Sequence, residues 1–124
     1  MNVRKKGHNY ELLIIKELKQ MGFDSAKSSR LASKLLDNCK VDIADIPFYI
    51  QCKSGYKTKN FNVSKEFNDI DTNLVKNKIH RNYPKLFFHK KDGYNVNNEI
   101  VTMTKDFFYK LLDNYIKNNI DLLQ

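Results

Sequence analysis

The sequence predicts a mixed α/β fold in which helices flank a β-sheet, and three observations support this class. First, 124 residues with an apolar share of 41% are enough for one ordinary hydrophobic core. Second, stretches with apolar side chains at helical spacing alternate with short apolar runs that are typical of strands. Third, glycine, proline and an Asp-Gly step separate these stretches. We therefore expect a single domain over residues 1–124, with the element order α-β-β-β-α-β-β-α.

The first half of the chain predicts one helix and three strands. Residues 8–20 place apolar side chains on one helical face, and Gly22 is typical of a helix end. Residues 23–27 predict a short strand, and residues 28–38 a polar loop with one helical turn. The segment 41–53 then has the pattern of two short apolar strands around a turn.

The second half predicts two helices and two strands. Ser64 is placed to cap a helix that reaches about residue 79. Residues 86–89 and 99–103 predict strands on either side of a turn at Asp92-Gly93. Thr104 then caps a last helix with the strongest periodic apolar stripe in the chain, formed by Phe107, Phe108, Leu111, Leu112, Tyr115 and Ile116.

Composition limits the partner and the compartment. The formal charge of +8, from 22 Lys and Arg against 14 Asp and Glu, favours a polyanion such as nucleic acid. The alternative is a lysine-rich surface that is merely well solvated. The longest apolar run, residues 12–15, is too short to cross a bilayer, so we expect a soluble, cytoplasmic protein without membrane contact. Two cysteines make neither a disulfide framework nor a zinc site, and a reducing compartment fits.

The residues with side chains suited to binding a metal ion or a phosphate are concentrated in the segment 41–53. Because side chains alternate along a strand, Gln51 and Lys53 share one face while Cys52 points toward the core. If the two strands form a hairpin with an even-numbered loop, Asp42 lies opposite Tyr49 and on the face of Gln51 and Lys53. A carboxylate, an amide oxygen and an ammonium would then meet, which suits a divalent cation and a phosphate.

Further motifs precede this segment in a definite order: the basic stretch Arg4-Lys5-Lys6-Gly7, Tyr10-Glu11 in the helix, Gly22-Phe23 at its end, and Ser29-Arg30 with Ser33. In this combination the sequence resembles the PD-(D/E)XK nuclease superfamily, and within it the archaeal-type and phage Holliday junction resolvases, over about residues 3–54. The resemblance implies a restriction-endonuclease-like fold and a Mg²⁺-dependent endonuclease, with Mn²⁺ as a substitute. It also implies branched or junction DNA as substrate and a homodimer, and it is compatible with a phage or mobile-element origin.

The resemblance assigns roles to individual residues. Asp42 matches the metal-binding aspartate, Gln51 takes the place of the second acidic ligand, and the backbone carbonyl of Cys52 completes the set. Lys53 matches the lysine that orients the attacking water or steadies the phosphorane charge, and Glu11 matches the helical acid that reaches the metal. DNA is expected to contact the basic arm (1–7), the Arg-Ser stretch and the basic loop after the last of these strands, that is Arg4, Lys5, Lys6, Arg30, Ser33, Lys57 and Lys59.

Two departures from the family pattern leave alternatives open. Val41 stands where proline is common, and Gln51 replaces a carboxylate by a neutral amide, which weakens metal binding and gives Glu11 more of the ligation. A catalytically inactive nucleic-acid-binding protein of the same fold is therefore an alternative, as are a restriction or repair-type nuclease on other DNA structures and a protein that acts on RNA. Taken alone, Glu11 could instead offset a helix dipole, and Lys53 could be a solvated strand residue.

Overall fold

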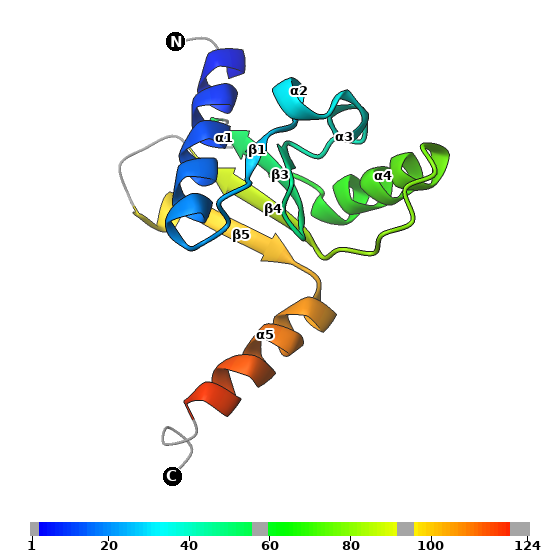
Figure 1. Ribbon diagram of the computed structural model, residues 1–124. Helices are drawn as coiled ribbons and strands as arrows, with labels where there is room; N and C mark the ends of the chain where they lie inside the picture. The colour runs from blue at the N-terminus through cyan, green and yellow to red at the C-terminus, as the bar shows by residue number, and fades with distance from the viewer. Residues whose placement is uncertain (1–2, 56–59, 92–95, 120–124) are drawn as a thin grey trace.

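The computed structural model describes residues 3–55, 60–91 and 96–119 of the chain, and its combination of helices and strands confirms the predicted α/β class. Lys57, Lys59 and the turn expected at 92–93 lie outside the described residues. The elements (Figure 1) are, in chain order, α1 (Val3–Gln20), β1 (Lys27–Ser28), α2 (Ser29–Ala32), α3 (Lys34–Asn38), β2 (Ile43–Ala44), β3 (Tyr49–Ser54), α4 (Val63–Lys76), β4 (Lys85–Lys90), the 3₁₀ turn η1 (Val96–Asn98), β5 (Glu99–Met103) and α5 (Lys105–Asn118).

The described strands form two small sheets. In the larger sheet, β3 runs parallel to β4, and β4 runs antiparallel to β5. The smaller sheet pairs β1 with β2, so that Lys27 lies opposite Ala44. The hairpin expected within residues 41–53 is therefore wrong, because β2 takes β1 and not β3 as its partner.

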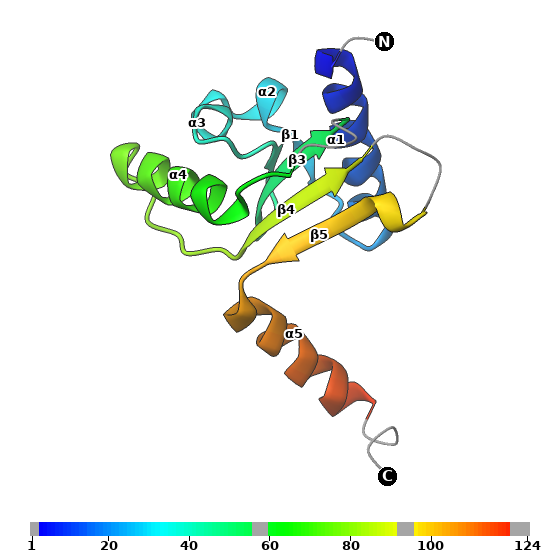
Figure 2. The same ribbon diagram turned by 180° about the vertical axis from the view of Figure 1, so that it is seen from behind.

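Helices cover both faces of the three-stranded sheet, α1 on one side and α4 on the other, as Figure 1 and Figure 2 show from opposite directions. Ile50 and Cys52 of β3 point into the cluster that contains α1. Tyr49, the residue before them, points into the cluster that contains α4. The alternation expected for β3 is confirmed, since Gln51 reaches a residue of α4.

The first helix is longer than expected, because residues 3–7, predicted to form a basic arm, make up its first turns. Its end at Gly22 is confirmed: Gly22 has a φ of +106°, a conformation that glycine adopts without steric cost. The Phe23 N–H donates to the Leu18 carbonyl at 3.0 Å, which closes the helix end in a Schellman arrangement. The strand expected over residues 23–27 is wrong, since β1 begins at Lys27.

The polar stretch 28–38 forms two short helices. Ser33 caps α3, and its hydroxyl accepts a hydrogen bond from the Leu36 N–H at 3.2 Å. The Ser29 hydroxyl donates to the Val41 carbonyl. This bond holds the start of α2 against the chain segment that leads into β2, and so fixes the position of Arg30.

The second half follows the predictions closely. Asn62, and not Ser64, caps α4. The bounds predicted for β5 and the cap at Thr104 are confirmed, with the Phe107 N–H donating to the Thr104 hydroxyl at 3.2 Å. None of the helices in the described part of the chain is long and apolar enough to cross a membrane.

Candidate functional site

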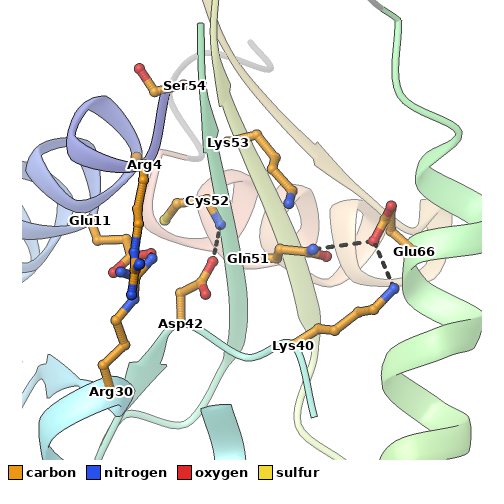
Figure 3. Close-up of a pocket in the computed structure, with 11 residues that line it drawn as sticks. Arg4, Glu11, Arg30, Lys40, Asp42, Gln51, Cys52, Lys53, Ser54 and Glu66 are labelled. Carbon is orange, nitrogen blue, oxygen red and sulfur yellow. Dashed lines mark hydrogen bonds and ion pairs between the residues drawn. The ribbon is translucent and has the colours of Figure 1, made fainter. Parts of the chain in front are cut away.

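An open pocket of about 330 Å³ lies at the free edge of β3 and contains all the residues predicted to be catalytic. In Figure 3, Gln51 and Lys53 extend from β3, Asp42 lies beside the strand, and Glu11 approaches from α1. The lining residues are Arg4, Gly7, Glu11, Arg30, Lys40, Asp42, Gln51, Cys52, Lys53, Ser54 and Glu66. The structure therefore brings together groups that are up to 62 positions apart in the sequence (4 to 66).

Asp42 is held against the edge of β3 by two hydrogen bonds. Its backbone N–H donates to the Ile50 carbonyl at 2.8 Å. Its carboxylate Oδ2 accepts from the Cys52 N–H at 2.7 Å (Figure 3). The residue opposite Asp42 is thus Ile50 and not Tyr49 as predicted, because the two segments meet at a sheet edge and not in a regular hairpin. One oxygen of Asp42 satisfies an edge N–H that no strand covers.

Burial gives Asp42 an unusual proton affinity. Burial raises the pKa of Asp42 to about 7, and the Cys52 N–H bond opposes this increase. The negative charge of Glu11 raises the pKa of Asp42 further, while the positive charges of Lys53 and Arg30 lower it. Near neutral pH the carboxyl group is therefore close to half-ionised, and an added cation would favour its ionised form.

Gln51 presents an amide oxygen to the pocket. Its Nε2 donates to Glu66 Oε2 at 3.1 Å. Because a carboxylate can only accept, this bond fixes which end of the amide faces α4. Gln51 Oε1 is buried and has no hydrogen-bond partner among the described residues. An oxygen of this kind is available to a ligand.

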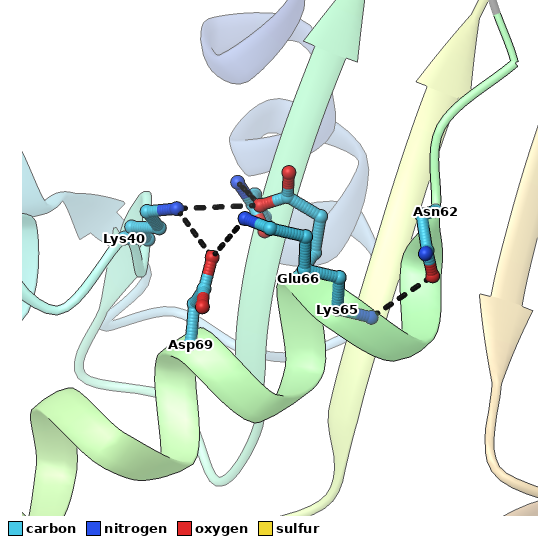
Figure 4. A network of polar contacts seen from close by, with 6 residues as sticks. Lys40, Asn62, Lys65, Glu66 and Asp69 are labelled. Atoms are coloured by element: carbon cyan, nitrogen blue, oxygen red, sulfur yellow. Dashed lines mark hydrogen bonds and ion pairs between the residues drawn. The ribbon is translucent and has the colours of Figure 1, made fainter.

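Glu66 is a pocket residue that the sequence analysis missed. It lies in the first turn of α4 and belongs to the network in Figure 4, in which Lys40 Nζ lies 3.7 Å from Glu66 Oε2 and 2.8 Å from Asp69 Oδ2. Lys65 Nζ lies 3.1 Å from Asp69 on its other side. The only sequence signal was a Glu in the first turn of a predicted helix, where acids are common for the sake of the helix dipole.

Glu11 is almost fully buried, with 2% of its surface exposed. Arg30 Nη2 donates to its Oε1 at 3.1 Å, while Oε2 is buried without a hydrogen bond among the described residues and lies 3.8 Å from His8 Nδ1. Burial raises the pKa of Glu11, and the charge and hydrogen bond of Arg30 oppose that effect. Because α1 begins at Val3, Glu11 lies far from the first turn, and the alternative that it offsets the helix dipole is wrong.

Lys53 and Cys52 have different parts in the pocket. Lys53 is half-buried and extends to the same side of β3 as Gln51 in Figure 3. Cys52 turns its side chain into the cluster that contains α1, and burial raises the pKa of its thiol well above the ordinary value. The thiol is thus no nucleophile at neutral pH. Only the backbone of Cys52 faces the pocket.

The expected DNA-binding residues separate into groups. Arg4, Lys5 and Arg30, with His8, line a second hollow of about 370 Å³, and Arg4 and Arg30 also line the pocket. A basic surface thus adjoins the predicted catalytic groups. Of the other expected residues, Ser33 serves as a helix cap, and Ser33 and Lys6 line neither hollow in the described structure.

The donor set suits a hard cation more than a soft one. In the described residues no three side chains of His, Cys, Asp or Glu are grouped to hold a metal ion. The pocket instead offers oxygen atoms from two carboxylates, Glu11 and Asp42, from the Gln51 amide and from the Cys52 backbone. Mg²⁺ needs few protein ligands because it keeps several waters, so this oxygen set fits it.

Comparisons with family models, with curated proteins and with solved structures found no match to this chain. The functional argument consequently starts from the pocket itself.

Proposed function

We propose that this chain is a metal-dependent endonuclease that hydrolyses phosphodiester bonds in DNA. One observation carries the proposal: Glu11, Asp42, Gln51 and Lys53, which the sequence pattern singled out, line a single pocket. Two of the buried oxygens there, Glu11 Oε2 and Gln51 Oε1, have no hydrogen-bond partner within the described chain. Buried polar atoms without a partner are costly and rare, and both of these belong to residues that line the same pocket.

Glu11, Asp42, the Gln51 oxygen and the Cys52 carbonyl are the groups that would hold a Mg²⁺ or Mn²⁺ ion. Such an ion, when bound, polarises a phosphate and makes water a better nucleophile at neutral pH. The Asp42 carboxyl, with its pKa of about 7, would bind the ion in its ionised form only. Metal affinity would therefore fall below neutral pH.

The remaining pocket residues can act directly on a phosphodiester. The Lys53 ammonium lies on the Gln51 face of β3 and can offset negative charge that gathers on non-bridging oxygens. Arg4 and Arg30 line both hollows and can hold the phosphates on either side of the scissile bond. Glu66 accepts from Gln51 Nε2, and so fixes which end of the amide carries the oxygen without a partner.

DNA is the substrate class that the charge favours. The net charge of +8 and the basic hollow of Arg4, Lys5 and Arg30 suit a backbone of phosphates. Contacts of this type position a duplex without reading its bases. Among DNA structures, branched DNA is favoured by the resemblance to Holliday junction resolvases.

The test compares cleavage of a labelled four-way junction with cleavage of a linear duplex in Mg²⁺. Wild type is expected to cut the junction, and Asp42→Asn to bind it without cutting. Asp45→Asn is a matched control: Asp45 has a φ of +63°, which Asn tolerates, and it forms a surface pair with Lys27 outside the pocket. Equal cleavage by wild type and Asp42→Asn would refute the assignment of this pocket.

A second candidate, an inactive DNA-binding protein, is favoured by the neutral amide at Gln51. It predicts tight binding without ions and no product in Mg²⁺ or Mn²⁺. The variant Gln51→Glu separates the two: cleavage that appears only in this variant indicates an inactive relative, whereas cleavage by wild type indicates an enzyme. In both cases the logarithm of the binding constant should fall linearly with the logarithm of the salt concentration.

A further inference from the structure

The last helix of the described chain has an apolar stripe that nothing covers. In Figure 1 and Figure 2, α5 extends away from the sheet and from the other helices. None of its residues is buried. Four large side chains of the stripe are between 39% and 57% exposed, namely Phe108, Leu111, Leu112 and Tyr115.

A helix in this state needs a partner. A 14-residue helix is marginal in water by itself, because most helical stability comes from packing of the apolar face. The opposite face of α5 is already satisfied, since Lys110 pairs with Asp106 at 3.2 Å and Lys117 with Asp113 at 2.9 Å. The face that lacks a partner is therefore the apolar one.

A matching surface lies beside the base of α5. An apolar groove of about 390 Å³ runs between α1 and the outer strands, where α1 covers β3 but leaves the same face of β4 and β5 open. Met21, Phe88, Val101 and Met103 line it, and Glu17 is its only charged lining residue in the described chain. Because Phe107 and Leu111 of α5 form one wall, the groove and the stripe are one continuous apolar surface.

We propose that this surface is the interface with a second copy of the same chain, in which α5 of each copy seats in the groove of the other. A convex stripe next to a concave groove is self-complementary under a two-fold axis, since one rotation covers both. At roughly 200 Å² for each large side chain, the four half-exposed residues of the stripe offer roughly 400 Å² of apolar area. With the groove added, each copy approaches the roughly 800 Å² per partner that stable interfaces bury.

Charge supports a second copy over a polyanion. The stripe and the groove contain no basic side chain, and the charges on the outer face of α5 are paired within the helix. The basic hollow of Arg4, Lys5 and Arg30 belongs to a different part of the surface. The dimer is thus independent of the proposed nuclease pocket, and either proposal can fail without the other.

The experiment is the solution mass of the full chain, measured by light scattering over a range of concentrations. Wild type is expected at twice its 14.7 kDa. The double variant Leu112→Gln/Tyr115→Gln should weaken the dimer roughly a hundredfold, because it removes apolar anchors from the interface. The control variant Lys110→Gln/Lys117→Gln introduces two glutamines on the opposite, charged face of α5. It should leave the dimer intact.

The groove is tested separately on β5. Val101→Gln, on the groove side of the strand, should also dissociate the dimer, whereas Thr102→Gln, at the next position and on the other face, should not. Thermal unfolding confirms that the body of each variant is folded. A 14.7 kDa species at every concentration, or a dimer that survives the stripe or groove variants, would overturn the proposal.

Discussion

Replacing Asp42 by asparagine should stabilise the protein at alkaline pH while it removes the response to metal ions. The pKa of Asp42 is raised from an ordinary 3.8 to about 7 by burial. Between those values the native state keeps the carboxyl protonated, whereas the unfolded chain has lost the proton. The native state then binds more protons, so the stability of wild type falls as the pH rises from about 4 to about 7.

The size of the effect follows from the pKa. Each pKa unit corresponds to about 1.4 kcal/mol, so a shift of about three units corresponds to roughly 4 kcal/mol above pH 7. Asparagine carries no charge and its oxygen can still accept from the Cys52 N–H, but its amide group is buried at a cost of about 1 kcal/mol. We expect Asp42→Asn to gain about 2–4 kcal/mol over wild type at pH 8, or roughly 10 °C in Tm, and close to nothing at pH 4.

The assay is urea or thermal unfolding of both proteins from pH 4 to pH 8, with Asp45→Asn as the surface control. Mn²⁺ should raise the Tm of wild type at pH 8 and leave that of Asp42→Asn unchanged, since ligands that bind only the native state stabilise it. A constant difference between the two proteins across the pH range would show that ionisation of Asp42 costs nothing. The explanation of Asp42 as a buried carboxyl group that an added cation would ionise would then be refuted.

Three other predictions concern the pocket and the core. Glu66→Gln should weaken Mn²⁺ binding about tenfold in calorimetry, because an amide at position 66 can donate as well as accept and no longer fixes the orientation of Gln51; Asp69→Asn, in the same network without a bond to Gln51, should have no such effect. Gln51→Glu should lower the Tm without metal, through repulsion by Glu66, but enlarge the shift that Mn²⁺ produces. Ile70→Ala, on the buried face of α4, should cost about 3 kcal/mol in urea unfolding, whereas Val75→Ala, at an exposed position of the same helix, should cost under about 0.5 kcal/mol.

Features that depend on neighbouring residues were predictable from the sequence. Gly22 ends α1 and Thr104 begins α5 because both act through hydrogen bonds within one helical turn. The opposite faces of Gln51 and Cys52 follow from the geometry of a single strand. Those local rules placed Gln51 and Lys53 on one strand face, whereas Asp42 was assigned from the expected hairpin and Glu11 from the resemblance.

Features that depend on which distant segment packs or pairs with a residue were not predictable from the sequence. The two residues of β2 carry no information that selects β3 over β1, and the pairing with β1 was missed. Lys40 and Glu66 were missed, since they meet only where α4 packs beside the segment that leads into β2. Similarly, the periodicity of α5 predicted an apolar stripe, but periodicity does not tell which surface covers it.

The neutral residue at position 51 makes physical sense once Glu66 is taken into account. A glutamate at this position would face the Glu66 carboxylate at the distance where Gln51 now donates a hydrogen bond of 3.1 Å. Two carboxylates so close together cannot both stay ionised without a cation between them. An amide avoids this conflict, because one end donates to Glu66 while the other end presents Oε1 to the pocket. The pocket thus keeps the carboxylates of Glu11 and Asp42 together with an amide oxygen at position 51, so Gln51 is compatible with ion binding.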